Sequence, residues 1–152
     1  MVPNDDVPLD LPPGVEVLFV AGFGPVTRDV AAARTLYAGR LGLPLKAMEG
    51  NPDYLHTDAL EGAAYLALWP LAQAAESCFG QPDWPADLPV PQAWIEFDVR
   101  DVAAASQAMR AAGERLLVDT RTEPWGQVVT RFLSPEGLLV GLTFTPWRRA
   151  AP

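Results

Sequence analysis

The sequence predicts an α+β fold built from two βαβββ modules, each a strand, a helix and three further strands. The first observation is a repeat: RDVAAA occurs at Arg28–Ala33 and again at Arg100–Ala105, 72 residues apart in a chain of 152 residues. The second is that each copy follows an extended apolar run and opens a helical pattern. The third is that three strand candidates follow each predicted helix.

The first module starts with the apolar run VLFVAGFGPVT and continues into a predicted helix. Asp29 stands at the N-cap position, where its carboxylate can accept a backbone N–H bond at the positive end of the helix. Four residues follow at helical spacing: Val30, Ala33, Tyr37 and Leu41. Gly42 lies where a helix commonly ends. Strands are then predicted at about 45–49, 54–58 and 63–69, with NPD and LEG as turns between them.

The second module repeats this order. The run AWIEFDV leads to Asp101 at a second N-cap position, and the predicted helix ends near Gly113. Its helical spacing is carried by Val102, Ala105, Met109 and Ala112. Strands are predicted at 116–122, 127–133 and 138–144. The sequence SPEG before the last of them is typical of a type I turn, with proline second and glycine fourth.

The segment between the modules is predicted to lack regular structure. Residues 71–80 are expected to form a loop, and residues 81–92 carry four prolines, which suits a linker. We therefore expect one domain over residues 1–152, with module one at about 15–70 and module two at about 93–145.

Composition limits the partners and the compartment. A formal net charge of −8 argues against binding to a phosphate backbone and fits a cationic or neutral partner better. Cys78 is the only cysteine, which excludes an intrachain disulfide and a thiolate metal cluster. The start, MVPNDDVPLDLPPG, lacks the pattern of a signal peptide, and no apolar run is long enough to span a membrane. A cytoplasmic protein with a flexible N-terminal leader is therefore predicted.

Several motifs carry a family resemblance. They are V-x-D-V at the second helix entrance, PWGQ at 124–127 and SPEGLLVGL at 134–142, in the setting of a βαβββ module used twice. In their order and spacing, over about residues 15–144, the chain resembles the vicinal oxygen chelate superfamily, which includes glyoxalase I, extradiol dioxygenases and bleomycin-resistance proteins. The resemblance implies that the mixed sheet curls into a cup with the helices on its outer face. A ferredoxin-like α+β domain is the alternative.

Side-chain alternation along the strands predicts which residues face this cup. In AWIEFDV the apolar residues face the helices, which leaves three residues pointing inward: Trp94, Glu96 and Asp98. In AAYLALW the leucines face outward, which leaves Tyr65, Ala67 and Trp69 pointing inward. In LLVGLTF the inward residue is Gly141, and the repeat offset makes Gly22 the counterpart of Trp94.

Metalloenzymes of the family carry one His or Glu at each of four inward positions. Here those positions hold Gly22, Ala67, Trp94 and Gly141, none of which can bind a divalent ion. The single histidine, His56, has no partner at a ligand spacing and is expected to be a packing or partly exposed residue. We therefore expect no metal and no other cofactor, which favours the metal-free branch of the family.

The predicted ligand-binding residues are aromatic and acidic: Trp94, Trp69, Trp125, Tyr65, Glu96 and Asp98. The aromatic rings would provide walls for stacking or cation–π contacts. The resemblance to bleomycin-resistance proteins implies binding of an aromatic or cationic small molecule, in a resistance or sequestration role. The structural alternatives are that the tryptophans fill a core and that Glu96 is paired with Arg131.

Two other functions stay open at this point. One is a metal-independent isomerase, epimerase or lyase in which Glu96 or Asp98 acts as general base. The other is a divalent-metal glyoxalase or dioxygenase with ligands at unexpected positions, such as His56 with Glu96 and Asp98. A homodimer is expected because many relatives pair modules across a two-fold axis, and Trp147 would suit such an interface. The identity of the ligand and the presence of catalysis do not follow from the sequence.

Overall fold

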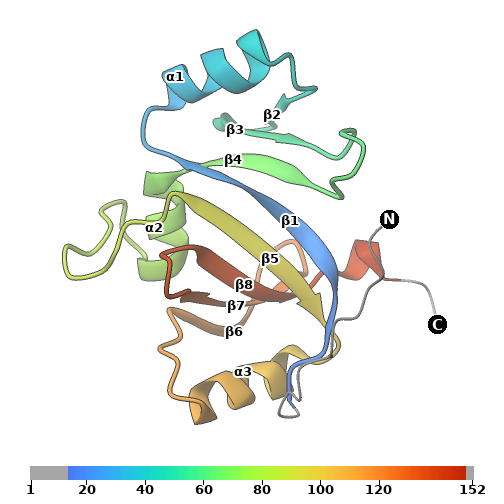
Figure 1. Cartoon of the computed structure of the whole chain (residues 1–152), viewed down its shortest axis with the longest axis vertical. Helices are drawn as coiled ribbons and strands as arrows, with labels where there is room; N and C mark the ends of the chain where they lie inside the picture. Colours follow the sequence, from blue (N-terminus) through green and yellow to red (C-terminus); the bar gives the residue numbers. More distant parts are fainter. Residues whose placement is uncertain (1–13, 150–152) are drawn as a thin grey trace, which may run out of the picture.

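The computed structural model describes residues 14–149 (Figure 1). The leader expected at the N-terminus therefore lies outside the described residues, apart from Gly14. The strands are β1 (Val17–Thr27), β2 (Lys46–Met48), β3 (Asn51–Thr57), β4 (Leu66–Pro70), β5 (Ala93–Val99), β6 (Val118–Thr122), β7 (Val128–Leu133) and β8 (Leu139–Phe144). They form one mixed sheet in the order β2-β3-β4-β1-β5-β8-β7-β6. This sheet contains every strand that the sequence predicts.

Three α-helices within the described residues accompany the sheet: α1 (Val30–Arg34), α2 (Leu71–Phe79) and α3 (Val102–Ala111). A π-helical segment, η1 (Thr35–Arg40), continues α1, and a short 3₁₀ turn, η2 (Pro146–Arg148), follows the last strand. None of the helices within residues 14–149 has the length and apolar character needed to cross a membrane.

The two modules have the same internal pairing. In the first, β1 is parallel to β4, and in the second, β5 is parallel to β8. The modules join through the antiparallel pair β1 and β5, which cross the middle of the molecule in Figure 1. The predicted fold, an α+β arrangement of two βαβββ modules in a curled sheet, is confirmed.

The local signals that predict the helices and the last turn are also present in the structure. The carboxylate of Asp29 accepts a hydrogen bond from the Ala32 backbone N–H at 2.9 Å, and Asp101 does the same for Ala104 at 3.0 Å. The turn before β8 is closed by a bond of 2.9 Å from the Gly137 N–H to the Ser134 carbonyl.

On the outer face of the second module, α3 packs against the sheet and forms a hydrophobic core with it. Val102 and Ala105 of α3 are buried against apolar side chains of the sheet, among them Phe132, Val140 and Leu142. In contrast, α1 and η1 bury none of their residues. Figure 1 shows α1 and α3 at opposite ends of the long axis of the molecule.

One prediction about the connection is wrong. Residues 71–79, expected to be a loop, form α2, which ends at Gly80 in the left-handed conformation (φ 74°). Ala74, Ala75 and Cys78 of this helix are buried, and α2 contacts β4 and β1. The proline-rich stretch 81–92 contains no helix or strand, as predicted. The helix forms a wall on the concave side of the sheet, where the sequence predicted only a loop.

Candidate functional site

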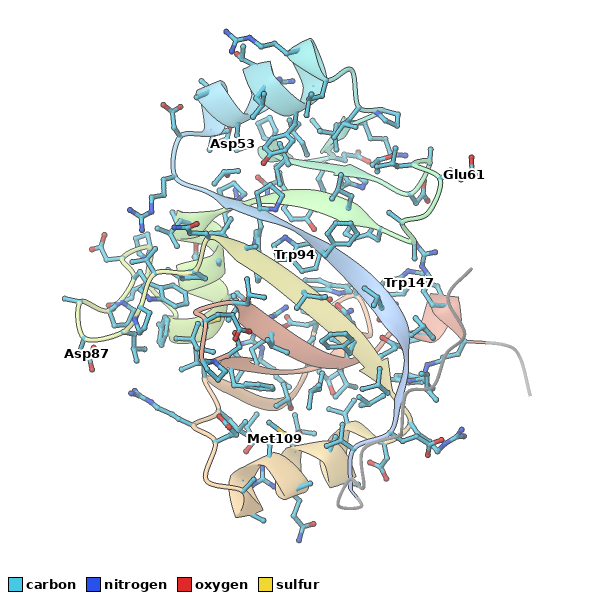
Figure 2. All side chains as sticks on the ribbon, viewed as in Figure 1. Asp53, Glu61, Asp87, Trp94, Met109 and Trp147 are labelled. Carbon is cyan, nitrogen blue, oxygen red and sulfur yellow. The ribbon has the colours of Figure 1, made fainter. Side chains whose placement is uncertain are left out.

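A cavity of about 1010 Å³ lies on the concave side of the sheet. Side chains from both modules, from α2 and from the C-terminal segment line it. Figure 2 shows Trp94 near the centre of the molecule and Trp147 beside the C-terminal segment. The lining residues are Ala21, Met48, Gly50, Asn51, Tyr54, His56, Tyr65, Trp69, Gln73, Glu76, Ser77, Trp94, Glu96, Arg121, Glu123, Trp125, Gln127, Arg131, Thr145, Trp147 and Arg148.

Aromatic rings form the inner wall of this cavity. Trp94 is 4% exposed, and its ring lies edge-on to Trp69 with 6.0 Å between ring centroids. Tyr65 lies on its other side at 6.4 Å. The indole N–H of Trp94 donates a hydrogen bond of 3.1 Å to the Ala67 carbonyl, which fixes the orientation of the ring. Trp94 therefore combines a packing role with an edge that faces the cavity.

Next to this wall, His56 lies between two tyrosines. The hydroxyls of Tyr54 and Tyr65 are 2.9 Å apart and share a hydrogen bond. The His56 ring lies 6.0 Å from the Tyr54 ring and 5.8 Å from the Tyr65 ring. Burial raises the pKa of Tyr65 and raises that of Tyr54 well above its usual value, whereas burial and the nearby Lys46 charge lower the pKa of His56. At neutral pH the phenols are protonated and the imidazole is uncharged.

A network of charged groups forms the base of the cavity. Arg131 approaches Glu96 at 3.3 Å, and the side-chain amide of Gln127 donates to the other carboxylate oxygen of Glu96 at 3.4 Å. The Arg131 guanidinium lies 5.0 Å from the centre of the Trp69 ring and donates to the Ser77 hydroxyl at 3.0 Å. The Arg131 and Glu96 side chains are 6% and 14% exposed. This pair is thus shielded from water, and each charge is compensated within the network.

A second ion pair extends the network toward the rim. Arg121 donates to Glu123 at 2.7 and 2.9 Å and also to the backbone carbonyl and the hydroxyl of Ser77. Glu123 in turn lies 3.9 Å from Arg131. Two carboxylates and two guanidinium groups therefore alternate, with Ser77 of α2 as a shared acceptor.

Two tryptophans stand at the rim of the cavity. Trp125 and Trp147 are 59% and 60% exposed, the largest exposures among the aromatic side chains of the described residues. The indole N–H of Trp125 donates to Gln127 at 3.1 Å, and Gln127 donates to the Thr145 hydroxyl at 3.0 Å. The rim is thus tied to the charged base while its rings stay accessible.

Asp98 does not join the other predicted ligand-binding residues. It points to the same side of β5 as Trp94 and Glu96, but its side chain is fully buried and does not line the cavity. Its oxygens accept hydrogen bonds from the Thr143 hydroxyl, from the backbone and side chain of Thr145, and from Arg149. Asp98 therefore ties the C-terminal segment to the sheet.

The family resemblance implies four positions for metal ligands, and the residues at those positions do not fit a divalent ion. Gly22 lies against the rings of Trp94 and Tyr65, where an added Cβ would be 3.0 Å from each. Gly141 pairs with Glu96, whose Cγ would be 2.8 Å from an added Cβ. Trp94 and Ala67 supply no donor atoms of their own side chains to a metal. Within residues 14–149 no three His, Cys, Asp or Glu side chains converge as a metal site.

Five of the six predicted ligand-binding residues thus line the cavity: Tyr65, Trp69, Trp94, Glu96 and Trp125. Sequence reasoning missed the contribution of α2, which provides Gln73, Glu76 and Ser77. The signal was available, because the apolar residues of the LAQAAESCF segment recur at the spacing of a helix. His56 and Tyr54 are further lining residues, and only the curvature of the first module brings them to the cavity.

Comparisons with known proteins identify relatives of this architecture. The model of the Glyoxalase/Bleomycin resistance protein/Dioxygenase superfamily matches residues 23–142. A superfamily member from Vibrio splendidus 12B01 aligns with a TM-score of 0.53 at 14% identity, over 85% of this chain and 97% of that chain.

Two further solved structures are similar at comparable levels. The NAD-dependent benzaldehyde dehydrogenase structure from Legionella pneumophila has a TM-score of 0.52 at 12% identity, over 80% of this chain and 96% of that chain. A methylmalonyl-CoA epimerase variant from Streptomyces coelicolor has a TM-score of 0.49 at 21% identity, over 86% and 99%. No curated protein matches the chain. At these identities the likeness concerns the fold.

Proposed function

Because the chain belongs to the glyoxalase/bleomycin resistance protein/dioxygenase superfamily, we propose that it is a metal-independent protein that binds an aromatic or cationic small molecule in its concave cavity. The observation that carries the proposal is the wall of Trp69, Trp94 and Tyr65 with the exposed rings of Trp125 and Trp147 at the rim. Such rings bind planar ligands by stacking and cations by their faces. A resistance or sequestration role follows if the ligand is retained unchanged.

The charges of the cavity support an aromatic ligand more directly than a cationic one. Glu96 and Glu123, which would attract a cation, are already paired with Arg131 and Arg121. Glu76 also lines the cavity and forms no ion pair within the described residues. A positive group on the ligand would therefore be recognised by Glu76 or by the rim tryptophans.

The alternative function is a metal-independent isomerase, epimerase or lyase with Glu96 as general base. It rests on one observation, that the Glu96 carboxylate faces the cavity. However, both of its oxygens accept hydrogen bonds, one from Arg131 and one from Gln127. Glu96 is thus held in a network with Arg131 and Gln127 that accounts for its charge, which makes binding without turnover the better supported function.

A binding experiment with two planar probes tests the proposal. Proflavine is a planar cation and flavone is neutral, so calorimetry and quenching of tryptophan fluorescence compare charge with stacking. We expect both to bind, and we expect Trp125→Ala to weaken binding by roughly tenfold, or about 1.4 kcal/mol, because one stacking face is lost. Since Trp125 is 59% exposed, the variant keeps its fold.

Trp84 provides the matched control, because it is a tryptophan outside the cavity that packs on Phe79. Trp84→Phe is expected to bind both probes as the unmodified chain does. Failure of both probes to bind, or an equal loss in the two variants, would contradict the assigned cavity.

We also propose that the chain, as one domain of two modules (about 15–70 and 93–145) joined by the 81–92 linker, forms a homodimer. Support comes from β1, where Val20 and Phe23 point away from the cavity and remain 42% and 41% exposed. Two apolar side chains on the central strand of a sheet favour a surface that is covered by a second copy.

A further inference from the structure

A second cleft, separate from the cavity, lies where β1 ends and where α1 and α2 begin. Its volume is about 480 Å³, and none of its lining residues lines the cavity. The residues that matter for its chemistry are Thr27, Arg28, Leu71, Ala72, Asp83 and Trp84.

The start of α2 forms one side of this cleft. The helix has Pro70 at its N-cap, with no capping side chain and no acidic residue in its first turn. The first backbone N–H groups of a helix have no partner within the helix. The Leu71 N–H faces the Thr27 carbonyl in the parallel pairing of β1 with β4, whereas no side chain caps the N–H groups of Ala72 and Gln73. These N–H groups, at the positive end of the helix dipole, suit an anion.

Thr27 supplies an independent observation. Its side chain is 7% exposed and lines the cleft, and its hydroxyl is the one buried side-chain oxygen within residues 14–149 that has no hydrogen-bond partner. Its Cα is paired with that of Pro70, so the hydroxyl belongs to the residue next to the helix start. A buried hydroxyl without a partner is costly and calls for a ligand.

Arg28 adds a positive charge to the same cleft. It is exposed, and its guanidinium forms no ion pair with any residue that the structure describes. The opposite side of the cleft is formed by the linker, with the Trp84 ring and the exposed carboxylate of Asp83. The negative charge of Asp83 opposes anion binding, so its removal should strengthen binding, whereas removal of Arg28 should weaken it.

We infer that this cleft is an oxyanion site that binds a phosphate group, free or as a monoester, between the α2 N-terminus, the Thr27 hydroxyl and Arg28. The N–H groups of α2 and the hydroxyl donate to the phosphate oxygens, and the guanidinium compensates their charge. The organic part of a monoester would lie against Trp84.

Titration of the ¹⁵N-labelled full chain with inorganic phosphate tests the inference, with chloride keeping the ionic strength constant. We expect saturable shifts of the Ala72 and Gln73 amide signals. Thr27→Val and Arg28→Ala should each weaken binding by roughly tenfold, because each removes a hydrogen bond or charge at the phosphate. Asp83→Asn should strengthen binding. Arg34→Ala, which removes an equal charge from an exposed position on α1, should change nothing.

A stability measurement accompanies the titration. Thr27→Val removes an unpartnered hydroxyl, so it should raise the thermal midpoint without phosphate and reduce the further rise that phosphate gives to the unmodified chain. Titration with phenyl phosphate distinguishes a phosphate monoester from the free anion. Tighter binding than inorganic phosphate, with a shift of the Trp84 indole signal, indicates a monoester. Equal binding of the two indicates the free anion. Absence of saturable shifts at the α2 start, or an unchanged phosphate affinity in both Thr27→Val and Arg28→Ala, overturns the site.

Discussion

Three glycines decide how closely neighbouring groups approach around the cavity. Gly22 leaves room for the Trp94 and Tyr65 rings, and Gly141 leaves room for the Glu96 side chain. At Gly24 the neighbour is backbone, because an added Cβ would lie 1.9 Å from the carbonyl oxygen of Ala67. A side chain can move away from a new methyl group, whereas a carbonyl held in a parallel strand pair cannot. Of the three positions, Gly24 is therefore the one that tolerates a side chain least.

Gly24→Ala should destabilise the protein by about 3 kcal/mol or more, since the β1–β4 pair must separate to admit the methyl group. Urea unfolding, followed by tryptophan fluorescence, measures this loss. Gly39→Ala is the matched control: an added Cβ there meets nothing within 4 Å, and the residue lies in a helical segment. That variant should gain roughly 0.5–1 kcal/mol. Similar effects of the two substitutions would contradict the close approach at Gly24.

The two N-capped helices begin with the same local signal, but they differ in how many of their residues are buried. Asp29 and Asp101 make the same hydrogen bond to the residue three positions later. However, α3 buries Val102, Ala105 and Ser106, and the Ser106 hydroxyl lies 2.6 Å from that of Thr130 on β7. The first helix buries no residue and continues as a π-helical segment. Only the second helix is part of a core.

Asp101→Ala should therefore lower the global free energy of unfolding by about 1 kcal/mol, the usual value of an N-cap. Asp29→Ala should leave global unfolding nearly unchanged and increase amide hydrogen exchange only within residues 30–40, because that helix can fray alone. Equal losses of global stability in both variants would show that α1 is as strongly coupled to the sheet as α3.

At the scale of the whole molecule, the junction of β1 and β5 controls both faces of the sheet. The ladder shifts register between Val20 and Gly22, so that Gly22 pairs with Glu96 on the concave side. On the convex side, Phe23 pairs with Ile95 and remains 41% exposed. The junction that closes the cavity thus also presents apolar side chains outward, where the proposed dimer would form.

Light scattering of the purified chain should give the mass of two copies. Phe23→Glu should give the mass of one copy, because a charge in an apolar interface is left without a partner. Because Phe23 is exposed, the fold should tolerate this change. Trp147→Glu, at the rim of the cavity, should leave the mass of two copies unchanged, because the proposed interface lies on the convex side. A single-copy mass for the unmodified chain at all concentrations would contradict the homodimer.

Much of the fold could be predicted because its signals are local. The repeated RDVAAA segments, the two capping aspartates and the SPEG turn each act within a few residues, and the order of elements follows from them. The helix α2 was missed because its small apolar residues are weak signals beside a stretch rich in proline. Its helical state is favoured by the burial of Ala74, Ala75 and Cys78.

The sequence by itself determined which side of β5 a residue occupies, because side chains alternate along a strand wherever its backbone is regular. That parity put Trp94 and Glu96 on the concave side, where both line the cavity. Only the tertiary structure decided what covers each position. The C-terminal segment buries Asp98, Arg131 pairs with Glu96, and α2 closes the wall. These partners lie far apart in the sequence, and their contacts depend on how the sheet curves.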